Sequence, residues 1–243
     1  MTRLRKGGDE LAWTDIGPLD GDLVVCCHGA GYDGSTFAGL AAALAADGLR
    51  VVLPDNRGAG ASTDHDGLIA RQAHIALVDD LQALLAHLDA GSAILVGHSL
   101  GGWTALGTAV AAPPSGPGAV AGLVLASTPA GVFTPEVGAF WDGFAARLRD
   151  GAPPEAVAAL DLLRTSTPSL DEIAAVAGRC PTAFVVGADD PVYPPSVVRA
   201  AAAAMPGATV TEAPAAGHLV HVDAPNAVLA AVTQVRAGRR GSR

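Results

Sequence analysis

Short apolar runs alternate along the chain with longer segments whose apolar residues recur at helical spacing. The runs are short enough and apolar enough to be buried strands, at residues 23–27, 49–53, 93–96, 119–126, 183–186 and 208–211. Helical patterns lie between or after them, at residues 37–46, 68–88, 100–111, 196–204 and 226–235. This alternation predicts an α/β fold, a mostly parallel central sheet with helices on both faces.

One segment, residues 130–179, interrupts the alternation. It has helical patterns at 136–149, 155–164 and 170–177 but no strand pattern. Because the segment is inserted between two predicted core strands, we expect a short helical lid over one edge of the sheet. The alternative is an ordinary helical excursion with no gating role.

Composition supports a single globular domain over residues 1–243. Half of the residues are apolar, which is enough for a sizeable core. The formal charge of −9 argues against a nucleic-acid partner. No apolar run reaches the roughly 18 residues that a membrane span needs, and no signal core follows the basic start, so we expect a cytoplasmic protein without a membrane partner. The arginine-rich tail at 236–243 is predicted to be frayed and solvated.

The three cysteines do not suggest a disulfide framework. Cys26 and Cys27 are adjacent in a predicted strand, so their side chains should point to opposite faces of the sheet. Cys180 precedes another predicted strand. All three are interpreted as buried small apolar residues.

The strongest chemical signal is the sequence Gly-His-Ser-Leu-Gly at residues 97–101. It follows a predicted strand and opens a predicted helix, which is the setting of a sharp strand-to-helix turn that exposes the serine above the sheet. Ser99 is therefore the candidate nucleophile. A glycine-rich turn with a bystander serine is the alternative.

A serine hydroxyl needs an adjacent base, and the chain has seven histidines. His218 is the candidate because it follows Gly217 in a loop between the last predicted strand and the last predicted helix. His28 is expected to shape a loop, and the side chain of His98 is expected to point away from that of Ser99. His221 could join His218 in a metal site, but the sequence shows no third ligand, so neither a metal nor a cofactor is expected.

Two further requirements are a carboxylate that orients the histidine and donors for the oxyanion. Asp189 and Asp190 follow the predicted strand at 183–186, at the sheet edge where α/β sites lie. The pattern alone leaves the choice between them open. The glycine-rich loop after His28 permits close backbone approach, and the amides of Ala30 and Leu100 are the candidate donors.

These features together resemble the α/β-hydrolase superfamily over nearly the whole chain. Four stretches match in order, at residues 28–29 (His-Gly), 55–62 (Asp-Asn-Arg-Gly-Ala-Gly-Ala-Ser), 97–102 (Gly-His-Ser-Leu-Gly-Gly) and 217–218 (Gly-His). The resemblance implies the chain order Ser99, Asp190, His218, and it favours Asp190 because it ends a Gly-x-x-Asp pattern. It also implies that Asp55 and Arg57 hold loops without direct catalytic work.

Two differences from relatives of this fold narrow the activities that the resemblance implies. Haloalkane dehalogenases and epoxide hydrolases of this fold use an aspartate nucleophile, and this chain has a serine. The cofactor-free haloperoxidase-like relatives are more similar, but the loop after Gly29 lacks their usual proline and tryptophan. Five apolar residues of the expected lid either line an acyl pocket or pack against the sheet: Val132, Phe133, Phe140, Trp141 and Phe144.

The predicted activity is hydrolysis of a small-molecule carboxylic ester or lactone by a serine esterase-like enzyme. Ser99 would attack the carbonyl and His218 would take up and return the proton, so activity should fall as the imidazole becomes protonated at lower pH. Thioesterase, C–C hydrolase or acyltransferase activity on the same triad is an alternative. A binding protein that retained the fold is another.

Overall fold

The computed structural model describes residues 1–65, 67–149, 163–164 and 166–240. Its strands are β1 (Thr2–Lys6), β2 (Asp9–Ile16), β3 (Leu23–Cys27), β4 (Arg50–Pro54), β5 (Ser92–His98), β6 (Ala119–Ala126), β7 (Thr182–Gly187) and β8 (Thr209–Ala213). Its helices are the 3-10 helix η1 (Gly34–Phe37), α1 (Ala38–Ala46), α2 (Leu68–Leu88), α3 (Leu100–Ala111), α4 (Pro135–Arg149), α6 (Leu170–Ala177), α7 (Pro195–Ala203), α8 (Val220–Asp223) and α9 (Pro225–Arg240).

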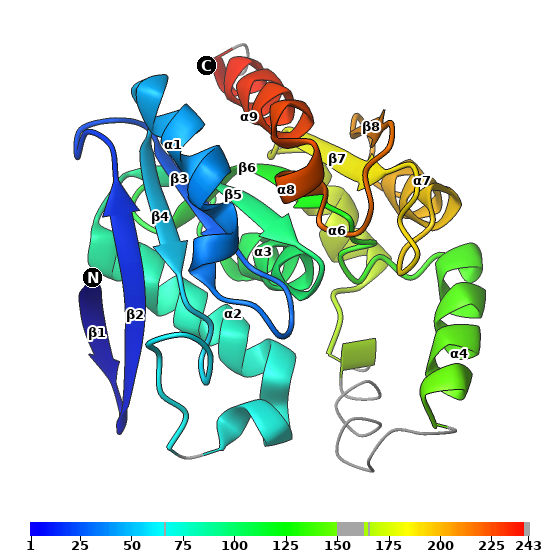
Figure 1. The fold of residues 1–243 in the computed structure, drawn as a ribbon, viewed down its shortest axis with the longest axis horizontal. Helices are drawn as coiled ribbons and strands as arrows, with labels where there is room; N and C mark the ends of the chain where they lie inside the picture. Colours follow the sequence, from blue (N-terminus) through cyan, green and yellow to red (C-terminus); the bar gives the residue numbers. More distant parts are fainter. Residues whose placement is uncertain (66, 150–162, 165, 241–243) are drawn as a thin grey trace.

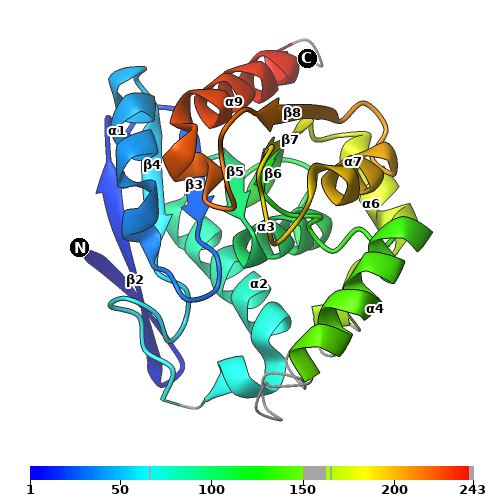
Figure 2. The ribbon, with the colours of Figure 1, turned by 45° about the vertical axis from the view of Figure 1, so that its right-hand side comes forward.

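The strands form one sheet in the order β1-β2-β4-β3-β5-β6-β7-β8. The pairs from β4 to β8 are parallel, whereas β2 is antiparallel to both β1 and β4. Figures 1 and 2 show helices on both faces of this twisted sheet, with α1 and α9 on one face and α2 and α3 on the other. The predicted α/β architecture is therefore confirmed.

Side chains of each parallel strand alternate between two cores, one on each face of the sheet. Val24 and Cys26 pack in the core beneath α1 and α9, whereas Val25 and Cys27 pack in the core beneath α2 and α3. The two neighbouring cysteines therefore point to opposite faces, as expected. Cys180 is also buried, and all three thiols are free. Burial raises the pKa of Cys27 to about 12, so this thiol stays protonated at neutral pH.

The structure corrects the sequence analysis at both ends of the chain. The hydropathy pattern does not reveal the hairpin β1–β2, because β1 lies at the edge of the sheet and most of its side chains are exposed. The tail at 236–243 is expected to be frayed, but α9 continues to Arg240, and residues 241–243 lie outside the described residues. Arg236 binds Asp22 at 2.8 Å and Arg239 donates to the Ser92 hydroxyl at 3.0 Å, so these contacts hold the last turns of the helix.

The segment at 130–179 contains α4 and α6, which matches two of its three expected helices. The third expected helix, at 155–164, lies almost entirely outside the described residues. Val132 and Trp141 are buried, and Phe133, Phe140 and Phe144 pack against the core beneath α2 and α3. Trp141 contacts Trp103 of α3 with ring centroids 5.2 Å apart. Of the two interpretations of these apolar side chains, the structure favours packing.

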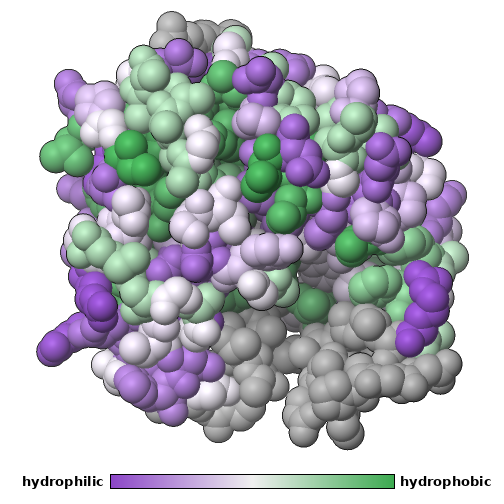
Figure 3. Space-filling model, viewed as in Figure 1, coloured by the Kyte–Doolittle hydropathy of each residue, from purple (hydrophilic) through white to green (hydrophobic). Residues whose placement is uncertain are grey.

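The surface seen in Figure 3 mixes hydrophilic and hydrophobic residues and is hollowed near its centre. Among the described helices, none combines the length and the apolar character that crossing a membrane would require.

Helix α3 lies so close to the sheet that glycine is required at its first turn. A Cβ added to Gly101 would lie 2.1 Å from the carbonyl oxygen of Cys27, and one added to Gly97 would lie 2.4 Å from that of Gly101. A Cβ on Gly102 would instead meet a side-chain methyl group, Thr128 Cγ2, at 2.3 Å. The carbonyl oxygen of Cys27 cannot move without shifting a strand, whereas the contact at Gly102 is relieved by a shift of one buried side chain, Thr128.

We therefore expect Gly101→Ala to destabilise the fold by about 3 kcal/mol or more, and Gly102→Ala by about 1 kcal/mol. Urea denaturation of both variants measures the difference. Equal losses would show that the backbone clash at Gly101 does not control the packing of α3.

Candidate active site

Ser99 lies at the sharp turn between β5 and α3. Its backbone has φ 51° and ψ −118°, a conformation that residues with a Cβ rarely adopt and that costs on the order of 1–3 kcal/mol. The Ser99 amide donates to the Ala126 carbonyl at 3.1 Å, and its own carbonyl accepts from the Gly102 amide at 2.9 Å. These bonds and the neighbouring glycines hold the strained turn, which places Ser99 at the N-terminus of α3.

Asp190 and His218 come together from the loops after β7 and β8. The His218 Nδ1 donates to the Asp190 carboxylate, with distances of 3.0 and 3.1 Å to its two oxygens. With its Nδ1 hydrogen committed to Asp190, the neutral ring has an unprotonated Nε2 that can accept a proton. The neighbouring Asp189 is exposed. The geometry therefore pairs Asp190, and not Asp189, with the histidine.

Asp190 is buried, with an exposed fraction of 5%, yet it is stabilised as a carboxylate. Burial by itself would raise its pKa, but hydrogen bonds from His218 and from the amides of Tyr193 and Val192 outweigh it and hold the pKa below its usual value. These two amides donate to Oδ1 at 3.0 and 2.8 Å. Asp190 is thus a fixed, charged acceptor behind the imidazole.

Two further residues contact His218 that the sequence analysis did not assign to the site. The Tyr193 ring lies 5.8 Å from the His218 ring, and it connects the histidine to Phe140 and Phe144 of α4. His98 Nε2 donates to the His218 carbonyl at 2.9 Å. The side chain of His98 is buried, and its position next to Ser99 in the chain was the only signal that pointed to it.

The His98 ring joins the two loops that flank Ser99. A Cβ on Gly29 would lie 2.8 Å from His98 Nδ1, so the ring also packs against the loop after β3. On its other side, the His98 ring centroid lies 4.5 Å from that of His221. The His221 ring in turn stacks on Phe37, with ring centroids 4.1 Å apart. Burial is the main reason that the pKa of His98 falls to about 3 and that of His221 to about 4. Both rings are therefore neutral at neutral pH.

The proximity of three imidazoles does not make a metal site. His98 Nε2 is engaged by the His218 carbonyl and His218 Nδ1 by Asp190. Within the part of the chain that the structure describes, no group of three or more histidine, cysteine or acidic side chains is arranged to hold a metal ion.

The loop after β3 contains the first candidate oxyanion donor, Ala30. His28 fixes this loop to the loop after β4, because its Nε2 accepts from the Asn56 amide at 2.8 Å and its Nδ1 lies 2.8 Å from the Gly29 carbonyl. The second candidate donor is the amide of Leu100, the first residue of α3, whose N–H has no acceptor within the helix. Ala30 and Leu100 line the same pocket.

Asp55 and Arg57 hold the surrounding loops, as the resemblance implied. Asp55 accepts from the amides of Gly34 at 3.0 Å and Ala61 at 2.8 Å. The Arg57 guanidinium is buried between two carboxylates: it donates twice to Asp80 at 2.8 Å and once to Asp9. Backbone amides thus hold the Asp55 carboxylate, and carboxylates hold the Arg57 guanidinium.

A model of the alpha/beta hydrolase family matches residues 24–232, which include every residue of the site described above. The chain belongs to the alpha/beta hydrolase family. The structure of a thermophilic esterase from Thermogutta terrifontis superposes on this hydrolase with a TM-score of 0.72 and 28% sequence identity, covering 98% of this chain and 99% of the esterase.

Two curated relatives are longer proteins. The dihydrolipoyllysine-residue acetyltransferase component of the acetoin cleaving system from Pseudomonas putida is 30% identical over 91% of this hydrolase. The magnesium-chelatase 30 kDa subunit from Rhodobacter capsulatus is 35% identical over 46% of it. The hydrolase spans 65% of the length of the first relative and 38% of the second. These matches support the family and leave the activity to be argued from the site.

The buried histidines His98 and His221 predict a pH-dependent stability. The folded pKa values of His98 and His221 lie below the ordinary value of 6.5, so the unfolded chain takes up these protons first as the pH falls. The free energy of unfolding should therefore decrease from pH 7 toward pH 4. His221→Met removes one such group, along with two buried ring nitrogens that have no hydrogen-bond partner.

We expect the variant to lose about 2 kcal/mol less than the wild type between pH 7 and pH 5. Chemical denaturation at the two pH values measures the difference, and His65→Met, at an exposed histidine, is the control. The same pH dependence in both variants and the wild type would contradict the assignment.

Proposed function

We propose that this alpha/beta hydrolase is a serine hydrolase that cleaves a small-molecule carboxylic ester or lactone. The observation that carries the proposal is the hydrogen bond between His218 Nδ1 and the buried Asp190, formed at the sheet edge where the strained Ser99 begins α3. This arrangement supplies a nucleophile, a base with a free Nε2 and a group that fixes the base. The esterase similarity over nearly the full chain agrees with it.

In the proposed reaction, the Ser99 hydroxyl attacks the substrate carbonyl while His218 Nε2 takes up its proton. Asp190 keeps the Nδ1 hydrogen in place and stabilises the imidazolium. The amides of Ala30 and Leu100 stabilise the negative charge on the carbonyl oxygen. The C–O bond then breaks, the leaving alcohol receives the proton from His218, and an acyl-enzyme remains. Water, activated by His218 in the same way, releases the acid and restores Ser99.

Acyl transfer to an acceptor other than water is the second candidate. It is favoured by the similarity, across 91% of this chain, to a protein described as an acetyltransferase component. The first half of the reaction would be identical, and the acceptor would replace water in the second half. Thioesters and C–C bonds are further substrates on which the same three side chains could act.

We also propose that the segment at 130–179 is a lid over the substrate. Its aromatic side chains reach the site through Tyr193, which contacts both Phe140 of α4 and His218. The proposed partner is a small molecule, in keeping with the acidic charge of −9, and the chemistry needs no cofactor.

The proposal predicts that a fluorophosphonate forms a single covalent adduct on Ser99. Intact-mass analysis should show one adduct on the wild type and none on Ser99→Ala, because only an activated serine attacks the phosphorus centre. Circular dichroism of the variant controls for folding. A folded wild type that forms no adduct would contradict the proposal and favour a binding protein that retained the fold.

Product analysis separates hydrolysis from transfer. An ester substrate is incubated with and without an alcohol acceptor, and free acid and new ester are measured. We expect free acid as the main product in both cases. New ester as the main product at millimolar alcohol would favour the acyltransferase.

A further inference from the structure

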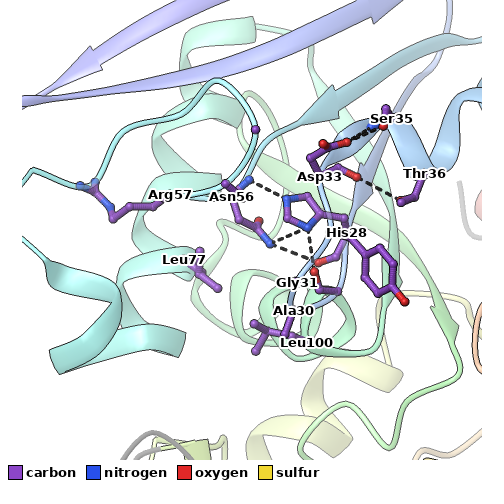
Figure 4. A pocket seen from close by; sticks show the side chains of 15 residues that line it. His28, Ala30, Gly31, Asp33, Ser35, Thr36, Asn56, Arg57, Leu77 and Leu100 are labelled. Atoms are coloured by element: carbon purple, nitrogen blue, oxygen red, sulfur yellow. Dashed lines mark hydrogen bonds between the residues drawn. The ribbon is translucent and has the colours of Figure 1, made fainter. Parts of the chain in front are cut away.

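A pocket of about 680 Å³ opens directly beside the two candidate oxyanion donors. Besides Ala30 and Leu100, its walls come from the loop after β3, the loop after β4 and Leu77 of α2. We call it the β3–β4 pocket. In Figure 4, Leu77, Leu100 and Ala30 lie at one side of it, and the polar residues of η1 and its N-terminal loop lie at the other. Its volume is within the range of pockets that enclose small organic ligands.

In the order of strands across the sheet, the pocket and His218 lie on opposite sides of Ser99. Ser99 follows β5, the pocket walls follow β3 and β4, and Asp190 and His218 follow β7 and β8. Among the described residues, Ser99, His218 and Asp190 do not line the pocket, which reaches the proposed site through Ala30 and Leu100. This division matters because the two halves of an ester have different needs. The leaving group must receive a proton from the histidine, whereas the acyl group needs no contact with it.

Charge further restricts what the pocket can bind. Arg57 is one of its lining residues, but its guanidinium is engaged by Asp9 and Asp80 and points away from His28 in Figure 4. The remaining charge is the carboxylate of Asp33, and hydrogen bonds from Ser35 lower its pKa. His28 is neutral, because burial lowers its pKa and its Nε2 accepts from an amide. Among the described residues that line the pocket, Asp33 therefore has the one charge that is not engaged by an opposite charge.

We propose that the β3–β4 pocket binds the acyl group of the substrate, and that this group is longer than acetyl and has no negative charge. The inference rests on the proposed function of Ser99. An acyl carbonyl held by the Ala30 and Leu100 amides directs its chain into the pocket, while the leaving group lies toward His218. Esters of neutral, medium-length acids are thus the preferred class, and esters of dicarboxylic acids are disfavoured.

The first test fills the pocket. Ala59 is a partly exposed lining residue, and Ala59→Trp should occupy the space of the acyl chain. The matched control is Ala42→Trp, at an exposed position of α1 outside the pocket. We measure kcat/KM for p-nitrophenyl acetate and p-nitrophenyl hexanoate. The hexanoate-to-acetate ratio should fall at least tenfold in Ala59→Trp and stay within twofold of the wild type in Ala42→Trp. Thr36→Trp, in the η1 wall, replaces Ala59→Trp if that variant does not fold.

The second test changes the charge. Asp33→Asn keeps an oxygen that can accept from the Ser35 amide but removes the negative charge. The adipate half-ester of p-nitrophenol has the length of the hexanoate ester and an added carboxylate. We expect the wild type to prefer hexanoate over the half-ester by about threefold or more, and Asp33→Asn to reduce this preference about threefold. Asp47→Asn, at an exposed aspartate after α1, should leave it unchanged.

A third pair of substrates tests whether the pocket binds the acyl half or the alcohol half of the ester. Ethyl acetate and hexyl acetate differ only in the leaving alcohol, so Ala59→Trp should change their ratio less than twofold. A larger effect on this pair than on the acyl pair would overturn the inference while leaving the proposed function intact. Hydrolysis of none of the esters, together with no fluorophosphonate adduct, would overturn the proposed function itself and this inference with it.

Discussion

The close approach of α3 to the end of β5 is the constraint on which the site depends. The Ser99 backbone is in a conformation that is unfavourable for a residue with a Cβ, and it persists because the surrounding backbone leaves no alternative path. Gly97 and Gly101 make that path possible, since a Cβ at either position would overlap a carbonyl oxygen. The same contact places the N-terminal amide of α3 beside Ser99. The proposed nucleophile and one proposed oxyanion donor therefore come from the same turn.

The other groups are positioned by loops, and each loop is held by bonds that do not take part in the chemistry. His28 and Asp55 tie the loop after β3 to the loop after β4. Asp190 is fixed by two amides of its own loop, and His98 binds the carbonyl of His218. His98 thus restrains a residue 120 positions away in the chain. Its neutrality is part of this role, because a proton on the buried His98 ring would be costly beside the His221 and His218 rings.

Sequence patterns are sufficient to predict an element or a site residue where its position depends only on the residues next to it in the chain. The boundaries of α2, α3 and β6 were predicted to the residue, because their apolar spacing is regular and turn residues flank it. The turn at Ser99 is also predictable from its own segment, since the strand, the glycines and the helix that form it are contiguous in the chain. The pairing of His218 with Asp190 needed more, because the pattern left Asp189 open and the family resemblance favoured its neighbour. The geometry then showed Asp190 buried and Asp189 exposed.

What the sequence did not show depends on contacts between distant segments. The hairpin β1–β2 is stabilised by pairing with β4 at the sheet edge, so its own hydropathy is weak. The aromatic residues near α4 have the same spacing whether they line a pocket or pack. Only their contacts with Trp103 and Tyr193 distinguish the two.

The groups proposed for proton transfer and the pocket proposed for acyl binding lie on different sides of β5. The groups proposed to move protons follow β7 and β8, where Tyr193 connects His218 to the aromatic side chains of α4. The β3–β4 pocket lies on the opposite side of β5, and His98 connects the two sides, because it bonds the His218 carbonyl and packs against Gly29 of the pocket wall. If the pocket binds the acyl group as proposed, a substitution such as Ala59→Trp would alter which acyl group fits while the hydrogen bond between Asp190 and His218 stays in place. Under the proposed function, acyl specificity and proton transfer would be set by different loops, and both would depend on the close approach of α3 to the sheet.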